Sequence, residues 1–176
     1  MSAPPGDITI YTDGACRPNP GPGGYGVVLI ADGLRRELSG GFRKTTNNRM
    51  ELFAIIRALR EVPPPQGQVT VYSDAQYVVS MINGGYAQQW RRDGWRRNRG
   101  KSPALNPDLW NDLLNLCDRC DVRFVWVRGH AENEENIRCD ELAVAAREAA
   151  SLPADEAYEG LARPAPAAQL LLFDGA

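Results

Sequence analysis

The sequence predicts an α/β protein built on a single mixed sheet flanked by helices. Short runs of β-branched and aromatic residues alternate along the chain with runs that carry apolar residues at helical spacing. Three strand-like runs come first, and helical runs separate the later ones. This order is typical of an antiparallel meander followed by parallel strands with helical crossovers. The chain has no internal repeat, and its 176 residues suit one domain with a short extension.

We expect a disordered leader over residues 1–6, a folded domain over residues 7–150 and a flexible, Pro/Ala-rich extension over residues 151–176. The N-terminus lacks the basic and apolar regions of a signal peptide, and no run of about 18 apolar residues predicts a membrane span. These features indicate a cytoplasmic protein, which we expect to be a monomer. The pair Cys117 and Cys120 has the spacing of a zinc or redox motif, but no second pair accompanies it, which favours reduced structural thiols.

The first strand is expected to begin at Ile8 and to stop at Asp13, where a glycine follows. Residues 17–24 are rich in proline and glycine and are expected to form a loop. Two strands should follow, over Tyr25–Ile30 and Leu34–Phe42, because Asp32-Gly33 between them is a hairpin signal.

A helix is expected to open at residues 45–48, because a buried face at i, i+3, i+4 and i+7 spacing follows, namely Leu52, Ile55, Ile56 and Leu59. Asn48 and Glu51 could form a capping box at its start. The later elements are expected in this order: strand Val69–Asp74, helix Gln76–Ile82, basic segment Tyr86–Lys101, helix from Asn106, strand Val122–Val127, acidic loop Glu132–Glu135 and a last helix through Asp140–Ala150.

Carboxylates stand at the ends of two predicted strands. Asp13 and Asp74 each close a β-rich run, and the helix between these runs carries Glu51. Each residue alone has a structural explanation, since Asp-Gly is a common turn pair and Glu51 could cap its helix. Strands that deliver two carboxylates to one edge of a sheet, beside a third on a helix, indicate a metal site.

Basic residues are concentrated in one segment of a chain whose formal net charge is −2. Residues 91–101 contain Asp93 as the sole acid, against Arg91, Arg92, Arg96, Arg97, Arg99 and Lys101. This asymmetry indicates a polyanion as partner. Trp90 and Trp95 lie among the arginines, which disfavours a purely solvated surface, although either ring could instead pack beneath the segment.

Four motifs occur together and in order: Tyr-Thr-Asp13-Gly-Ala-Cys16, Thr-Thr-Asn47-Asn48-Arg-Met-Glu51-Leu, Ser-Asp74-Ala-Gln76-Tyr, and Gly-His130-Ala with Asn136-Ile-Arg-Cys-Asp140-Glu-Leu-Ala. As a set they resemble the motifs of bacterial type 1 ribonuclease H. The resemblance covers residues 7–150 and implies a ribonuclease H-like fold with a mixed five-stranded sheet flanked by helices. It also implies an endonuclease that hydrolyses the RNA strand of RNA–DNA hybrids and leaves 5′-phosphate and 3′-hydroxyl ends.

The resemblance implies that two Mg²⁺ ions, or Mn²⁺ in their place, are held by four carboxylates: Asp13, Glu51, Asp74 and Asp140. Four crowded carboxylates repel one another, and two divalent cations would cancel their charge. His130 matches the family's catalytic histidine, although a lone histidine is more often a surface or core residue. The family often has glycine where this chain has Glu132, so the loop after His130 is expected to be stiffer or more acidic.

Substrate contacts are also implied by the resemblance. Reading the 2′-hydroxyl of RNA suits groups that both donate and accept hydrogen bonds, and the residues expected near the RNA strand are Asn19, Asn47, Gln76 and the backbone at Cys16. Asn48 is expected to lie toward the DNA strand. A pocket formed by Lys44, Thr46 and Asn106 is expected to hold a phosphate of that strand. The basic segment resembles the family's DNA-binding protrusion, with contacts from Trp90, Arg91, Arg92, Trp95, Arg96 and Arg97. Each amide could instead be a cap or turn residue.

The end of the chain carries a separate signal. Gln169, Leu170, Leu172 and Phe173 resemble the short peptide with which many bacterial replication and repair proteins bind the sliding clamp. The alternative is that these apolar residues fold back onto the domain.

Two other functions compete with the nuclease. A non-catalytic module of the same fold could bind hybrids without cutting them, but such a module has no need of crowded carboxylates. Another nuclease or an integrase of the same broad fold is disfavoured by the Thr-Asn-Asn sequence before Glu51 and by the basic segment.

Overall fold

The computed structural model describes residues 6–62, 67–129 and 133–160. A five-stranded sheet runs through it in the order β3-β2-β1-β4-β7. The strands are β1 (Ile8–Cys16), β2 (Gly21–Ala31), β3 (Leu34–Thr45), β4 (Val69–Ser73) and β7 (Val122–Trp126). β1 pairs antiparallel with β2 and parallel with β4, and β4 pairs parallel with β7. The predicted mixed sheet, with a meander before the parallel strands, is confirmed.

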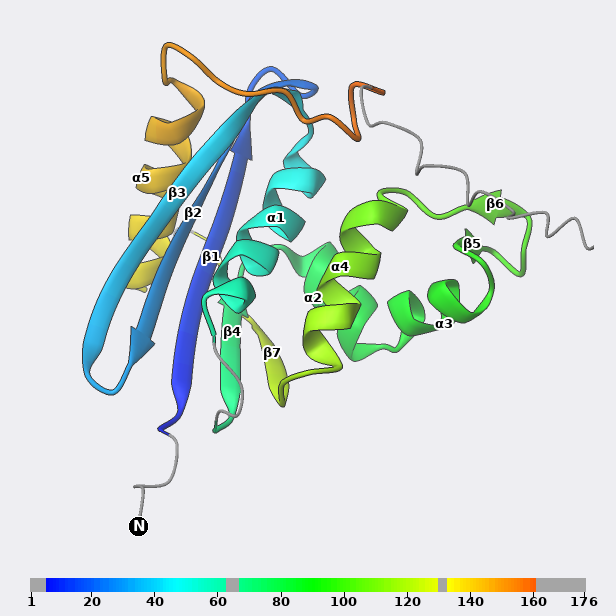
Figure 1. The fold of residues 1–176 in the computed structure, drawn as a ribbon, viewed down its shortest axis with the longest axis horizontal. Coiled ribbons are helices and arrows are strands. Elements are labelled where there is room, and N and C mark those ends of the chain that lie inside the picture. The colour runs from blue at the N-terminus through cyan, green and yellow to red at the C-terminus, as the bar shows by residue number, and fades with distance from the viewer. Residues whose placement is uncertain (1–5, 63–66, 130–132, 161–176) are drawn as a thin grey trace, which may run out of the picture.

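Helices cover both faces of the sheet (Figure 1). They are α1 (Asn47–Arg60), α2 (Gln76–Asn83), α3 (Tyr86–Arg92), α4 (Pro107–Cys117) and α5 (Glu134–Arg147), and a small hairpin, β5 (Arg96–Arg97) with β6 (Ser102–Pro103), follows α3. α5 packs on β1, β2 and β3, while α1 lies between β1 and α4. The predicted apolar face of α1 is buried, with exposures of 0 to 2% for Leu52, Ile55, Ile56 and Leu59.

The start of β2 differs from the sequence-based expectation. The loop predicted over residues 17–24 is confined to 17–20, because β2 already begins at Gly21. The predicted end of the first strand at Asp13 was also wrong, because β1 stays paired with β2 as far as Cys16. Tight packing of α5 explains the glycines here, since a Cβ on Gly24 or Gly26 would collide with backbone carbonyl oxygens of α5. The glycines therefore belong to a strand that a helix covers closely, and the loop prediction for residues 21–24 was wrong.

The N-termini of two helices also differ. The Thr46 hydroxyl caps α1 by accepting the N–H of Arg49, so the capping box expected from Asn48 and Glu51 was wrong. α5 begins at Glu134, earlier than expected, because the Asn133 side chain accepts two N–H groups of its first turn. The end of the expected acidic loop thus forms the first turn of α5, where the partial positive charge of the helix favours acids.

Residues 151–160 pack against the domain. The backbone N–H of Arg43 donates to the carbonyl oxygen of Pro153 at 2.9 Å, and the Asp155 carboxylate is only 6% exposed. The packed part of the chain therefore continues beyond residue 150. All four cysteines are free thiols, and none of the described helices has the length and apolar character needed to cross a membrane.

Candidate active site

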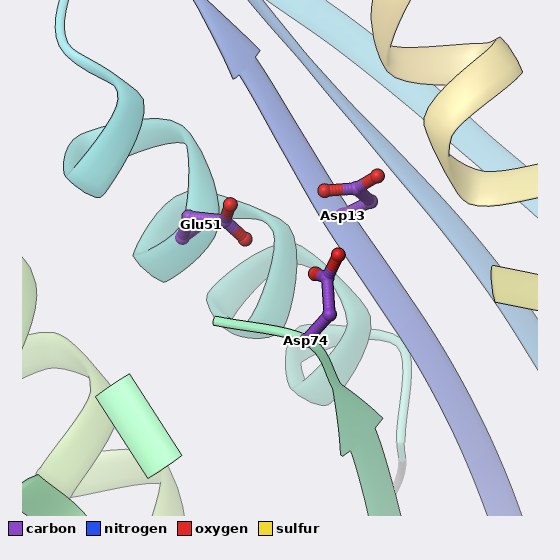
Figure 2. Close-up of side chains that lie close together, drawn as sticks. All are labelled: Asp13, Glu51 and Asp74. Carbon is purple, nitrogen blue, oxygen red and sulfur yellow. The ribbon is translucent and has the colours of Figure 1, made fainter. Parts of the chain in front are cut away.

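Three carboxylates face one another where β4 ends beside β1 (Figure 2). Asp13 lies on β1 and is 5% exposed, Glu51 lies on α1 and is 7% exposed, and Asp74 directly follows β4. One carboxylate oxygen of each residue lies within 4.8 Å of the others. The predicted clustering of these three carboxylates is therefore present, although Asp13 lies within β1 and only Asp74 follows the end of its strand.

The sheet register brings the two aspartates together. β1 and β4 are parallel, and Thr12 pairs with Ser73, so the residues that follow these two lie side by side. Gly129, after β7, leaves space for the Asp74 carboxylate, because a Cβ at this position would collide with it. The indole N–H of Trp126 donates to the backbone oxygen of Asp74 at 3.3 Å. This bond connects the end of β7 to the residue that follows β4.

Burial and mutual repulsion raise the proton affinity of this cluster. Burial and the charge of Asp74 raise the pKa of Asp13 to about 7, although the N–H of Gly14, donating at 2.7 Å, opposes the shift. Burial raises the pKa of Glu51 well above its ordinary value, and the charges of Asp13 and Asp74 add to the effect. Such a cluster favours protons or cations over bare carboxylates.

The cluster fits a hard divalent cation. The Oε2 atom of Glu51 is buried and has no hydrogen-bond partner in the described part of the chain. All three side chains offer oxygen ligands, which Mg²⁺, Mn²⁺ and Ca²⁺ prefer. A cation at the centre would give this Glu51 oxygen a partner and cancel the repulsion between the carboxylates.

Two of the predicted catalytic residues lie apart from this cluster or outside the described chain. Asp140 is half-buried on α5, and its charge contributes to the raised pKa of Asp13, but it is not one of the three clustered carboxylates. His130 lies outside the described residues.

Two of the predicted RNA-reading amides are linked to the cluster. The Asn47 amide donates to the Glu51 carboxylate at 3.5 Å and accepts the N–H of Cys16 at 3.2 Å. The Asn19 side chain accepts the N–H of Asn47 at 3.2 Å. Gln76 is the exposed first residue of α2, and its N–H donates to the carbonyl oxygen of Asp74. Asn48 is exposed on α1.

Two of the three residues predicted to bind a DNA phosphate, Thr46 and Asn106, contact Arg49. Lys44 is exposed, Thr46 accepts the backbone N–H of Arg49, and the Asn106 side chain accepts from the guanidinium at 3.4 Å. Sequence reasoning missed both Arg49 and its buried partner Asp155. Arg49 stands in the quoted Thr-Asn-Asn motif, but its partner lies 106 residues away and carries no local signal.

The structure divides the basic segment. A cavity of about 490 Å³ lies between α2, α3 and the β5–β6 hairpin. It is lined by Trp90, Arg96 and Arg97 among the predicted contact residues, and by Arg99, which the sequence placed in the basic segment. Tyr77 and Tyr86 also line it, and neither was predicted as a substrate contact. Trp90 is mostly buried, with its ring edge-on to Trp110 at 5.8 Å, so it serves the core as well. Trp95 is half-buried.

Two arginines of the basic segment do not line this cavity. Arg91 instead pairs with Asp118 at 2.9 Å, and Arg92 is exposed at the end of α3. The structure thus brings together only part of the predicted DNA-binding set.

The fold and the acidic centre together define an α/β enzyme with a site suited to a divalent cation. The model of the ribonuclease H family matches residues 5–148, and the chain belongs to this family, whose members depend on metal ions. A ribonuclease H of Syntrophus aciditrophicus (strain SB) is 57% identical over 155 residues, which cover 88% of each chain.

Solved structures agree with this assignment. LC9-RNase H1, described as a type 1 RNase H with the type 2 active-site motif, superposes with a TM-score of 0.71 at 29% identity, over 84% of this chain and 74% of that one. LC11-RNase H1 in complex with an RNA/DNA hybrid superposes with a TM-score of 0.60 at 30% identity, over 80% of this chain and 96% of that one.

Proposed function

We propose that the protein is an endonuclease that hydrolyses the RNA strand of RNA–DNA hybrids and leaves 5′-phosphate and 3′-hydroxyl ends. The observation that carries this proposal is the buried cluster of Asp13, Glu51 and Asp74 in a chain of the ribonuclease H family. The homologous LC11 enzyme bound to a hybrid supports the choice of substrate. A module that only binds hybrids would gain nothing from carboxylates whose pKa values are raised by burial and by their mutual repulsion.

Two Mg²⁺ ions, or Mn²⁺ in their place, are the proposed cofactors, held by Asp13, Glu51, Asp74 and Asp140. When bound, such a pair would supply activation of the attacking water and stabilisation of the leaving 3′ oxygen. Asp13 and Glu51 must lose any protons they hold before they act as ligands, so metal binding should release protons. His130 is proposed to move a proton or to help the product leave, which suits the ordinary pKa of histidine.

Selection of the RNA strand is assigned to Asn19, Asn47, Gln76 and the backbone at Cys16. Their support is the hydrogen-bonded chain from Asn19 through Asn47 to Glu51, which fixes amide groups beside the reacting site. An amide that is already held in place loses little conformational entropy when it binds a 2′-hydroxyl.

The DNA strand is assigned to a second surface. Asn48 would face it, one of its phosphates would lie against Lys44, Thr46 and Asn106, and the basic segment would follow its backbone. The aromatic and basic lining of the cavity at β5–β6 supports this, because arginines bind phosphates and aromatic rings stack on bases or sugars. The enzyme is proposed to act in the cytoplasm as a monomer, with Gln169, Leu170, Leu172 and Phe173 as a clamp-binding peptide.

The test is cleavage, in Mg²⁺, of three duplexes of one sequence: an RNA–DNA hybrid, double-stranded RNA and double-stranded DNA. We expect cuts in the RNA of the hybrid alone. Asp13→Asn and Asp74→Asn should abolish cleavage while hybrid binding persists or strengthens, because the site loses negative charge. Hybrid binding by the wild type without any cleavage would instead favour the non-catalytic module.

A further inference from the structure

Asp155, in the segment that follows the last helix, is buried against an arginine of α1. Its two carboxylate oxygens accept from Nε and Nη2 of Arg49 at 2.6 and 2.9 Å, and the Thr45 hydroxyl donates to it at 2.7 Å. Arg49 is 4% exposed and Asp155 is 6% exposed. Charge-assisted bonds to both oxygens, made away from water, hold the guanidinium in one orientation.

The same guanidinium reaches the start of α4. It donates to the two carboxylate oxygens of Asp108 at 3.0 and 2.7 Å and to the Asn106 side chain at 3.4 Å. The two carboxylates therefore outweigh the single positive charge of Arg49, so the guanidinium has no charge to spare for a phosphate. The guanidinium instead joins three parts of the chain: α1, the segment around Asp155 and the start of α4.

Asn106 and Thr46 are left with free donor groups by these contacts. Asn106 precedes α4 with a φ of 54°, and its side chain makes no capping bond. Because its carbonyl oxygen accepts from Arg49, its NH₂ group remains to serve as a donor. The Thr46 oxygen accepts the N–H of Arg49, so its hydroxyl proton is also available. Both neutral donors contact Arg49, and exposed Lys44 lies two residues before Thr46 in the chain, a set of groups suited to one phosphate.

We propose that Asp155 is a positioning residue for the DNA strand: it holds the Arg49 guanidinium, which in turn orients Asn106 toward a backbone phosphate. Residues 151–160, which contain Asp155, are anchored to β3 through Arg43. The backbone N–H of Arg43 donates to the Pro153 oxygen at 2.9 Å, and the Arg43 guanidinium pairs with Glu159 at 2.9 Å. The chain beyond α5 thus belongs to the substrate-binding apparatus. This inference rests on the proposed function, since the phosphate is that of a hybrid's DNA strand.

The experiment compares wild type with Asp155→Asn on an RNA–DNA hybrid and on a set of hybrids that each carry one uncharged methylphosphonate in the DNA strand. On the unmodified hybrid we expect the KM of Asp155→Asn to be about fivefold higher than that of wild type, with little change in kcat. A rise of this size corresponds to the weakening of one hydrogen bond between the protein and the charged phosphate. At one methylphosphonate position the wild type should lose affinity and the difference between the two proteins should disappear.

The matched control is Asp112→Asn, the same substitution on α4 at an exposed pair with Arg60, and it should leave KM unchanged on every hybrid. Thermal melts establish that each variant is folded at the assay temperature. Should Asp155→Asn not fold, Asp108→Asn takes its place, because it loosens the same guanidinium from a more exposed position.

An unchanged KM would overturn the inference, and so would a KM penalty of equal size on every hybrid of the set, because that would be a general loss of structure. Failure of the proposed function looks different, since the wild type would then cleave no hybrid at all.

Discussion

A Cβ atom on Gly14 would lie 2.5 Å from the backbone nitrogen of Glu51, so only glycine lets α1 come this close to β1. Asp13 precedes Gly14 on the strand, and this close approach is what sets the Glu51 carboxylate beside that of Asp13 (Figure 2). The geometry of the acidic cluster therefore depends on a residue that has no side chain.

Gly14→Ala should push α1 away from β1 and weaken Mg²⁺ binding. We expect a loss of about 1–3 kcal/mol in stability, as for other overpacked sites, and a lower Mg²⁺ affinity in calorimetric titration. Gly33→Ala is the control, because Gly33 has a φ of 75° and open space around it, so the same substitution should cost stability alone. Wild-type Mg²⁺ affinity in Gly14→Ala would contradict the packing argument.

The raised pKa of Asp13 predicts a pH dependence of stability in the absence of metal. Burial and Asp74 raise this pKa from 3.8 to about 7, so between these values the folded protein holds a proton that the unfolded chain releases. The contribution of this group to stability is therefore present below pH 4 and is lost as the pH rises to about 7. In EDTA, the Tm of wild type should fall across this range relative to that of Asp13→Asn. Parallel curves for the two proteins would show that the carboxyl is not perturbed.

His130→Ala should slow turnover by roughly 10²-fold, the usual effect of removing a positioned acid or base. Mg²⁺ binding should be unchanged in calorimetry, because the proposed ligands are carboxylates. A loss of Mg²⁺ binding would show that His130 is itself a ligand.

The acidic cluster could be predicted from sequence because its information is local. Asp13 and Asp74 each end a strand-like run, and parallel strands joined by a helical crossover bring such ends to one edge of the sheet. The buried face of α1 could be predicted for the same reason, since its apolar spacing is visible in one window of sequence.

Features that depend on distant packing could not be predicted in this way. Residues 21–24 have the composition of a loop, but they pair with β1 and β3 as part of β2, where Gly24 lies against α5 and Gly23 against Met50 of α1. Trp90 lies among arginines in the sequence, yet its ring is mostly buried and packs edge-on against Trp110. Asp155 follows the last helix in a stretch that looks like a linker, and its role depends on a buried arginine 106 residues earlier.

The C-terminal peptide lies outside the described residues, and its clamp-binding role can be tested directly. Calorimetry of the full chain against purified sliding clamp should show binding that Gln169→Ala or Phe173→Ala removes, because a few apolar anchors supply most of the energy of such docking. No binding by the intact chain would refute the role. A clear fall in Tm on deletion of residues 169–176 would favour the fold-back alternative.

The salt dependence of hybrid binding should separate the arginines of the basic segment. Arg96, Arg97 and Arg99 line the cavity at β5–β6, whereas Arg91 pairs with Asp118. Each phosphate contact that is lost lowers the slope of log K against log salt by about 0.9 or less. The triple variant Arg96→Gln, Arg97→Gln and Arg99→Gln should therefore flatten the slope by up to about 2.7, if each arginine contacts one phosphate.

Arg91→Gln is the matched control for this triple variant. Its guanidinium is already engaged by Asp118, with Asn115 within 3.5 Å, so its loss should change the slope far less than the loss of an arginine at the cavity. Turnover at saturating hybrid should stay near that of wild type in both variants, because neither alters the carboxylates. A slope that the triple variant leaves unchanged would mean that these three arginines are only a solvated surface. The DNA strand would then have to be bound through the other assigned residues, such as Lys44, Thr46 and Asn106.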